Sequence, residues 1–536
     1  MKNVFTLLIL SSLLQVASAQ TFELVKDLRI PGNATPHGYI LFNSKIYFGA
    51  NSGTDIDLWA TDGTASGTTQ ITSGSPSNST FWGNIYPSVV LGNKLIFVGA
   101  DSGGFKEPCI TDGTTAGTSV IKNIHPTLSS NPAELTVYNN QVIFSARDNT
   151  TGIEPWITDG TALGTHLIKD IKPSGDSYPS RFIEYNGIIY FRAYTNAEGA
   201  ELWRTDGTDT GTYLVKDIYA GTQSSFPDYF AVFNDELFFQ AIDSAGGYEL
   251  WKTDGTDTGT VQVIDIIPGT VGSGPTYLTV VGNTLFFAAG DANGRSQIWK
   301  SDGTASGTVM VKDIYPTGDA QIEDPASVLG KFFFSANDGT HGLELWVSDG
   351  TAAGTFMVKD IFDGGGSSIY YPTPYQGKML FIADDGDNGY DIWITDGTTA
   401  GTHEIANPAN QNYSPLSSCW GFTEYNGWIY YTADYDNRGE EMWKMQLNIS
   451  GIDETHFENG KLSVYPNPAY NTINVSDNFN EPTDIRIVSV EGREVMRKNM
   501  QSGNVIDVSG LCNGMYLIEK LHKKICVAKS RFVKTE

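Results

Sequence analysis

The chain has 536 residues, a formal net charge of −27 and only four cysteines. Such acidity argues against nucleic-acid binding, which depends on basic patches, and four cysteines in so long a chain do not make a disulfide scaffold. After the first 20 residues, no apolar run in the sequence approaches the length of a membrane span.

Residues 1–19 have the pattern of a secretory signal peptide. Lys2 gives a basic start, an apolar run follows from Val4 to Leu14, and Ala17-Ser18-Ala19 precedes the expected cleavage point. No cysteine follows that point, so we do not expect a lipoprotein anchor. The pattern predicts export of the mature chain through the periplasm.

Residues 20–446 repeat one unit. An acidic residue, an apolar residue and Trp precede the turn Thr-Asp-Gly-Thr-x-x-Gly-Thr, and a strand ending in Val-Lys-Asp-Ile follows it. The aspartate of the turn recurs every 47 to 50 residues, at Asp62, Asp112, Asp159, Asp206, Asp254, Asp302, Asp349 and Asp396. A period of this length fits either a four-stranded propeller blade or a two-helix repeat.

The local pattern of the repeat favours strands. Before each Trp lies a hairpin-like segment, such as residues 182–191, in which Asn-Gly or a similar pair separates two aromatic and β-branched runs. No long stretch has apolar residues at helical spacing. Each unit therefore predicts four strands, and nine hairpins end at Ala50, Ala100, Ala146, Ala193, Ala241, Ala289, Ala336, Ala383 and Ala433.

The two ends of the array complement each other. Residues 22–28 resemble a fourth strand that lacks the first three, whereas the last unit ends with the strand of Trp443 and lacks a fourth. We expect an all-β fold, a β-propeller of about nine four-stranded blades closed by the N-terminal strand, because closure removes exposed sheet edges. An open solenoid, or eight regular blades with one distorted blade, are the alternatives.

Two further residue types have expected places in this array. The recurring lysine of the fourth strand suits an outer edge, where a charge blocks further pairing. Cys109 replaces the Trp of its repeat and Cys419 begins an inner strand, so we expect both to be buried free thiols. A Cys512–Cys526 bridge is the exception that the sequence permits.

The repeated Glu-Leu-Trp and Asp-Gly-Thr segments resemble the ELWxxDGT repeat proteins of bacterial surfaces. The resemblance covers residues 22–446 and implies an architecture, but it carries no established catalytic residues.

Residues 447–460 form a polar linker, and residues 461–536 have a different pattern. Tyr465-Pro466-Asn467-Pro468, Gly492-Arg493, the segment from Leu511 to Tyr516 and a basic tail separate short alternating runs that suit an Ig-like β-sandwich of about seven strands. This segment resembles the type A C-terminal sorting domain of type IX secretion cargo. The resemblance implies the type IX secretion machinery as a partner, and a secreted or surface location. An ordinary Ig-like module is the alternative.

The recurring features of the repeat have structural explanations. Asp and Thr side chains bond backbone N–H groups within a tight turn, where Gly supplies a positive φ. One Trp per blade at the same strand position is expected to pack in the core, with a glycan-stacking platform as the alternative. The acidic residue beside it is expected to accept backbone or hydroxyl hydrogen bonds, because buried acids need partners.

The loops between the second and third strands carry many acidic residues. In one of them, Asp385, Asp387 and Asp391 stand at alternating positions that resemble a short calcium loop, although the bidentate Glu of an EF-hand is missing. We predict a candidate calcium site at these three residues. The alternative is a loop of Asx turns that needs no metal.

Signatures of enzymes are largely missing from the sequence. The seven histidines include no His-Glu-x-x-His, and neither a Gly-x-Ser-x-Gly elbow nor a phosphate-binding Gly-Lys-Ser/Thr occurs. We therefore expect a secreted or cell-surface propeller that binds a glycan or protein ligand, for adhesion or surface interaction. A polysaccharide-degrading propeller enzyme with paired carboxylates, and a structural spacer, are the alternatives.

Overall fold

The computed structural model describes residues 20–53, 56–72, 88–387, 389–405, 416, 419 and 421–447, and in the C-terminal part residues 463–465, 471–476, 483–489, 494–500, 505–511, 514–522 and 525–534. These residues form strands and connecting segments, with no helix among them. Gln20–Leu447 makes one compact unit and the residues from Asn448 onward belong to another. The predicted signal peptide and almost all of the predicted linker lie outside the described residues.

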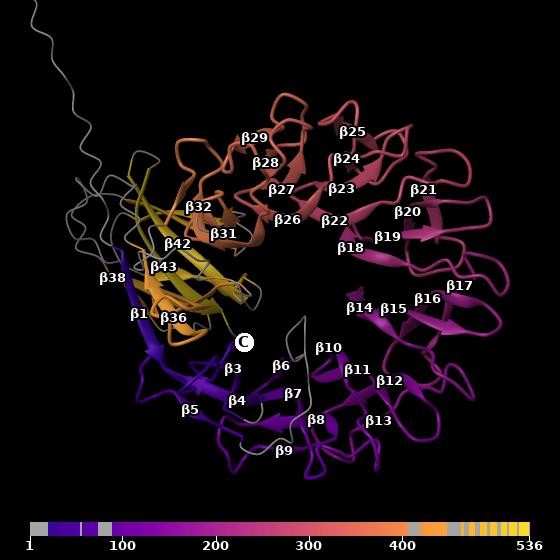
Figure 1. Ribbon diagram of the computed structural model, residues 1–536, viewed down its shortest axis with the longest axis horizontal. Helices are drawn as coiled ribbons and strands as arrows, with labels where there is room; N and C mark the ends of the chain where they lie inside the picture. Colours follow the sequence, from indigo (N-terminus) through magenta and orange to yellow (C-terminus); the bar gives the residue numbers. More distant parts are fainter. Residues whose placement is uncertain are drawn as a thin grey trace, which may run out of the picture. The chain divides into compact units, whose positions relative to one another are not determined.

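The first unit consists of nine four-stranded antiparallel sheets, which we call blades 1 to 9 in the order of their first strands. In Figure 1 the first strands β10, β14, β18, β22 and β26 face the centre of the unit. The first strands are β2 (His37–Phe42), β6 (Ser88–Leu91), β10 (Ala133–Tyr138), β14 (Ser180–Tyr185), β18 (Asp228–Phe233), β22 (Thr276–Val281), β26 (Glu323–Val328), β30 (Tyr370–Tyr375) and β34 (Thr423–Tyr425).

The second and third strands form the middle of each blade. The second strands are β3 (Lys45–Asn51), β7 (Lys94–Ala100), β11 (Gln141–Arg147), β15 (Ile188–Thr195), β19 (Glu236–Ile242), β23 (Thr284–Gly290), β27 (Lys331–Asn337), β31 (Lys378–Asp384) and β35 (Trp428–Ala433). The third strands carry the Trp series and are β4 (Ile56–Thr61), β8 (Lys106–Thr111), β12 (Ile153–Thr158), β16 (Gly199–Thr205), β20 (Tyr248–Thr253), β24 (Ser296–Ser301), β28 (Leu343–Ser348), β32 (Tyr390–Thr395) and β36 (Glu441–Gln446).

The fourth strands are short and lie outermost. They are β5 (Thr69–Gln70), β9 (Ser119–Val120), β13 (His166–Leu167), β17 (Tyr213–Lys216), β21 (Val261–Ile264), β25 (Val309–Lys312), β29 (Phe356–Lys359) and β33 (His403–Glu404), with β1 (Thr21–Lys26) as the fourth strand of blade 9. β1 pairs antiparallel with β36, so that Leu24 lies opposite Trp443. The pairing that the sequence predicts between the two ends of the array is thus present.

The hydrophobic core lies between neighbouring blades. One cluster joins Phe333 and Val358 of blade 7 to Phe381 and Trp393 of blade 8, and another joins Val25 and Tyr430 of blade 9 to Phe48 and Trp59 of blade 1. Alternation along the strands explains this arrangement, because the apolar face of each sheet packs on the next blade.

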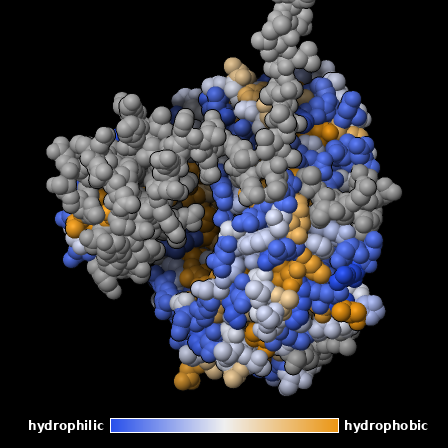
Figure 2. Space-filling model, turned by 90° about the vertical axis from the view of Figure 1, so that its left-hand side faces the viewer, coloured by the Kyte–Doolittle hydropathy of each residue, from blue (hydrophilic) through white to orange (hydrophobic). Residues whose placement is uncertain are grey.

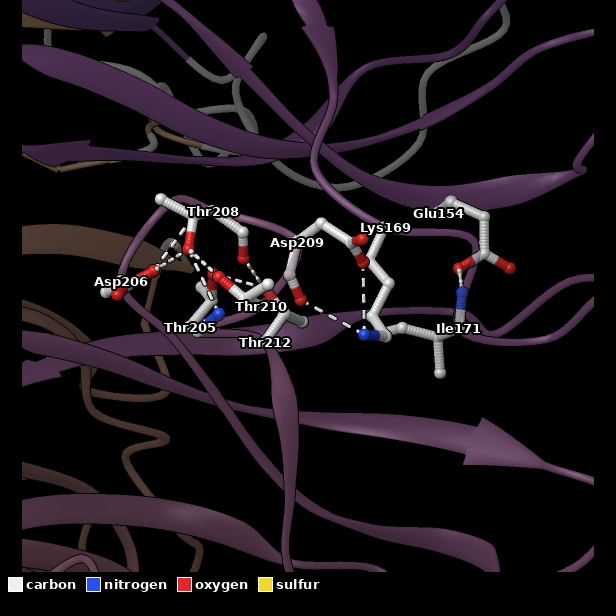
Figure 3. A network of polar contacts seen from close by, with 10 residues as sticks. Glu154, Lys169, Ile171, Thr205, Asp206, Thr208, Asp209, Thr210 and Thr212 are labelled. Atoms are coloured by element: carbon white, nitrogen blue, oxygen red, sulfur yellow. Dashed lines mark hydrogen bonds and ion pairs between the residues drawn. The ribbon is translucent and has the colours of Figure 1, made fainter.

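The Asp-Gly-Thr turns are held by their own side chains, as the sequence predicts. In blade 4, Asp206 Oδ1 accepts hydrogen bonds from the Thr208 N–H (2.9 Å) and hydroxyl (2.7 Å), while Thr205 and Thr212 join their hydroxyls at 2.6 Å (Figure 3). The same bonds recur in the other turns, for example at Asp349 and Thr351. These residues therefore shape the turn.

The lysines of the outer strands also contact the next blade. Lys312 Nζ donates to the Thr355 carbonyl of the next blade at 2.6 Å and lies 5.5 Å from the ring centroid of Trp346 in that blade. Lys169 reaches Asp209 of the next blade in the same way (Figure 3). The sequence predicts a charge at the outer edge but not this contact, which joins six of the blades to the next one, through Lys26, Lys122, Lys169, Lys216, Lys312 and Lys359.

The acidic residue that precedes the Trp in most repeats is buried and accepts hydrogen bonds, as expected. Glu154 accepts hydrogen bonds from Ile171 N–H (3.0 Å), Ser177 N–H (3.2 Å) and the Ser177 hydroxyl (2.6 Å), all in the segment that leads to the next blade. Burial raises the pKa of Glu154 to about 7, although these hydrogen bonds oppose the shift.

Both cysteines named from the repeat region, Cys109 and Cys419, are buried free thiols, as predicted. Cys512 lies outside the described residues, so a bridge to Cys526 stays a prediction.

The second unit contains two antiparallel sheets. One has the order β37 (Ser463–Tyr465), β38 (Thr472–Ser476) and β41 (Val505–Asp507), and the other has the order β40 (Glu494–Met500), β39 (Thr483–Ser489), β42 (Gly514–His522) and β43 (Ile525–Lys534). Ile473 and Ile506 of the first sheet pack against Ile487 and Ile518 of the second. The described residues therefore form a small β-sandwich.

Candidate functional site

The acidic loops between second and third strands are organised as turns. Asp148 accepts hydrogen bonds from the backbone N–H groups of Thr150 (2.8 Å) and Thr151 (2.6 Å), and Asp338 accepts them from Thr340 and His341. Hydrogen bonding to the charged form holds the pKa of both carboxyls below its ordinary value against the effect of burial. These loops thus match the Asx-turn description.

The three residues of the predicted calcium site lie at and after the end of β31. Asp385 Oδ1 accepts the Asp387 N–H at 3.0 Å, Asp387 is exposed, and Asp391 is buried in β32. Among the described residues no group of three metal-ligating side chains converges closely enough to hold an ion. Calcium binding at this loop stays a prediction.

A fourth carboxylate, Glu404 of β33, approaches this loop and was missed from the sequence. Partial burial of its carboxyl, together with the negative charges of Asp391, Asp385 and Asp387, raises the pKa of Glu404 to about 7. In blade 1 the same position holds Gln70, whose amide donates to Asp57 at 2.8 Å. Blade 8 thus places a second acid where blade 1 has a neutral donor.

A second feature, also missed from the sequence, runs along the innermost strands. Seven of them, within the described residues, contain a β-bulge at the same place, and the bulged residue has a left-handed backbone with φ between 47° and 69°. We call these residues the bulge row: Gly38, Glu134, Arg181, Tyr229, Tyr277, Asp324 and Tyr371.

The bulge row combines backbone strain with variable chemistry. A left-handed backbone costs an L-residue about 1–2 kcal/mol, and only Gly adopts it without that cost. Six of the seven positions nevertheless carry a side chain, and their types differ while the scaffold around them repeats. Strained residues and bulges of this kind cluster at functional sites, because they redirect a side chain.

Neighbouring members of the bulge row touch one another. The Tyr229 and Tyr277 rings meet edge to face with centroids 5.6 Å apart. Burial raises the pKa of Tyr277, and Tyr229, Glu323 and Asp324 raise it further, so these groups lie near one another. Tyr371, in blade 8, is 36% exposed. Blades 5 to 8 therefore present tyrosine rings next to carboxylates.

Blade 4 adds a cation to this surface. Arg181 Nε pairs with Asp228 Oδ1 at 3.0 Å, and Arg192 Nη1 pairs with Asp228 Oδ2 at 3.3 Å. The Arg181 backbone N–H donates to Glu134 of the preceding blade at 3.0 Å. The row thus contains a donor, two acceptors and three aromatic rings.

The bulge row and the acidic loops lie at the same end of each blade. The residue that ends a second strand donates its N–H to a backbone carbonyl in the segment that leads into the first strand of the same blade. Examples are Arg147 to Ser130 (2.8 Å) and Asp384 to Ser367 (2.8 Å). Sequence reasoning found the loops and missed the row. The sequence does carry a signal for the row. At one fixed position before the turn of each hairpin, the residue type changes from repeat to repeat, whereas the rest of the repeat is regular.

Figure 2 shows one side of the surface, coloured by hydropathy. Hydrophilic residues cover most of its coloured area, with hydrophobic residues in small separate groups. The described part of the chain contains no helix long and apolar enough to cross a membrane.

Comparison with known proteins identifies the C-terminal part. Residues 463–534 match the family described as the secretion system C-terminal sorting domain. This match indicates export to the cell surface or extracellular space by type IX secretion. No curated protein matches the chain.

Several solved structures are similar in fold. Puromycin hydrolase has a TM-score of 0.38 and 11% identity over 75% of this chain and 60% of its own, so this chain spans less than two thirds of that enzyme. The β-propeller domain of the Trilobed protease from Pyrococcus furiosus has a TM-score of 0.32 and 9% identity, over 60% of this chain and 98% of that domain. Prolyl oligopeptidase B from Galerina marginata has a TM-score of 0.38 and 9% identity, over 90% of this chain and 55% of its own. Because these TM-scores are low, the architecture of this chain is established by its own sheet topology and not by these structures.

Proposed function

We propose that the nine-bladed unit is an extracellular binding domain that holds a glycan on the bulge row, with a role in adhesion or surface interaction. The observation that carries the proposal is the set of side chains kept on strained, left-handed backbone at equivalent places of neighbouring blades. A structural role alone would favour Gly at all of these positions, as at Gly38.

The chemistry of the row suits a sugar. Tyrosine rings supply apolar faces for stacking, and the adjacent carboxylates and guanidinium group supply acceptors and donors for hydroxyl groups. By contrast, the Trp residues of the repeat are poorly placed for stacking on a ligand. Trp346 and Trp393 are only 6% and 5% exposed, and Lys312 and Lys359 lie over their rings.

The experiment measures glycan binding by the full chain on a glycan array, followed by calorimetric titration of the best ligand. Tyr277→Gly should weaken binding about tenfold, since an aromatic contact contributes about 1.5 kcal/mol. Its melting temperature should fall only modestly, because relief of the left-handed backbone offsets part of the packing that the partly buried Tyr277 ring makes against the neighbouring core cluster.

Tyr213→Ala provides the matched control. Tyr213 is 46% exposed but lies on outer strand β17, away from the row. Its replacement should leave binding unchanged, and an equal loss in both variants would contradict a site on the inner strands. Release of reducing ends from the bound glycan would instead favour the polysaccharide-degrading enzyme, and binding only to a protein ligand would favour that partner class.

A further inference from the structure

Arg181 is the one cation in the bulge row, and its guanidinium group is only partly used. Asp228 fixes its orientation through Nε, while the side chain remains 54% exposed. Within the described residues, no protein acceptor lies within hydrogen-bond distance of its two terminal nitrogens. Arg181 therefore offers oriented N–H donors on the bulge row, one blade before Tyr229.

The charges around Arg181 are balanced. Arg181 and Arg192 face Asp228, which pairs with both, and Glu134, which accepts the Arg181 backbone N–H. Two positive and two negative groups leave no excess charge, and the whole chain carries a net charge of −27. Free donors in this setting suit a neutral acceptor better than a carboxylate or sulfate group, which the field of the protein repels.

We infer that Arg181 is a specificity-determining residue that recognises the acetamido group of an N-acetylated sugar. An acetamido group has a neutral carbonyl acceptor for the guanidinium group, an N–H donor for a neighbouring carboxylate such as Glu134, and a methyl group that can pack on an aromatic ring such as Tyr229. The inference rests on the proposed function, since it specifies which glycan the bulge row binds.

Three tetrasaccharides with the same β-1,4 backbone test it, because they differ only at carbon 2. Cellotetraose carries a hydroxyl group there, chitotetraose an acetamido group and chitosan tetramer an amine. Titration calorimetry of the full chain should show tightest binding of chitotetraose. Arg181→Gly and Arg181→Gln should weaken chitotetraose binding about ten- to hundredfold, as expected for a lost hydrogen bond to a charged group, and leave cellotetraose binding unchanged.

Arg438→Gln is the control. Arg438 has a similarly exposed side chain (57%) and pairs with Asp436 at 3.1 Å, but it lies in blade 9. Its replacement should leave all three affinities unchanged. Thermal unfolding of Arg181→Gly checks that the fold is kept, and Gly38 shows that the row accepts Gly at this position.

The outcomes separate this inference from the proposed function. Equal binding of cellotetraose and chitotetraose overturns the role of Arg181 and leaves a glycan site in place. Tightest binding of the chitosan tetramer also overturns it, and would assign recognition to the carboxylates of Glu323 and Asp324. Failure of all three sugars, together with a blank glycan array, overturns the proposed function itself.

Discussion

At the scale of single residues, the buried carboxyl that precedes the Trp in most blades stabilises the connection to the next blade. Five blades pair this Glu with a Ser in that connection, as Glu201 does with Ser225, whose hydroxyl donates at 2.5 Å. Blade 6 replaces both members, since Gln297 accepts the Ile314 N–H at 2.8 Å and Ala320 takes the place of Ser. Glu441 of blade 9 keeps the acid but faces Ala34.

Glu441 is consequently the least satisfied of these acids. Leu28 N–H donates to Oε2 at 2.9 Å, while Oε1 is buried without a hydrogen-bond partner among the described residues. Burial, and then the charge of Asp27, raise the pKa of Glu441 to about 8, although its hydrogen bond to Leu28 opposes the shift. A carboxyl whose pKa rises on folding takes up a proton, so its contribution to stability is greatest below pH 4.5 and is lost as the pH rises through 8.

We predict that Glu441→Gln stabilises the first unit at pH 9 by about 2 kcal/mol, because the amide removes a buried charge, and has little effect at pH 5. Denaturant unfolding at the two pH values measures the difference. Glu154→Gln should gain less, because Ser177 already satisfies that carboxyl. A loss of stability at pH 9 in Glu441→Gln would contradict this account.

At the scale of single elements, the features that sequence reasoning predicted are those encoded within a few residues. The Asp206-Gly207-Thr208 turn and the Asn186-Gly187 hairpin carry their own hydrogen bonds or backbone preference. The bulge at Arg181 and the approach of Glu404 to Asp391 depend on strand register and on a partner strand. Neither has a local signature, so both emerged only from the three-dimensional structure.

The Trp strand allows a prediction about packing between blades. Trp346→Ala should destabilise the first unit by roughly 3–5 kcal/mol, because it leaves a cavity between Phe334 of its own blade and Ile314 of the preceding one. Thermal or denaturant unfolding measures the loss, and Trp203→Ala should behave alike. If Trp346→Ala instead lost glycan binding at unchanged stability, the result would support the alternative in which the Trp residues form a glycan-stacking platform.

The loop between β31 and β32 allows a prediction about calcium. If Asp385, Asp387 and Asp391 bind Ca²⁺, the ion should stabilise the fold by about 2.7 kcal/mol at a hundredfold excess over Kd. Extracellular sites often have Kd values on the order of 10⁻⁴–10⁻³ M, so thermal unfolding is compared in EDTA and in millimolar calcium. Asp387→Asn should remove the response.

Thr72→Val, in blade 1, serves as the control for this loop, because Thr72 donates to Asp57 at 3.2 Å in the blade that lacks the second acid. It should keep the full calcium response. Equal calcium responses in the full chain and in Asp387→Asn would exclude the loop, and no response in either protein would leave the acidic loops without a calcium site.

At the scale of the whole molecule, the N-terminal strand allows a prediction about association. Deleting residues 20–30 removes β1 and leaves β36 as an unpaired edge in blade 9. Exposed edges pair with other chains, so we expect aggregation and a lower melting temperature. Light scattering and size-exclusion chromatography measure the effect. A variant that stays monomeric and equally stable would contradict the role of β1.

The position of β36 also determines how the first unit responds to force. Leu447 follows this strand immediately, so tension on the later part of the chain enters the unit through β36. Because β36 pairs with β35 on one side and β1 on the other, a pull cannot peel it away as it would an edge strand. Two hydrogen-bonded ladders must break together. The N-terminal segment therefore acts as a mechanical clamp on the strand that bears the load.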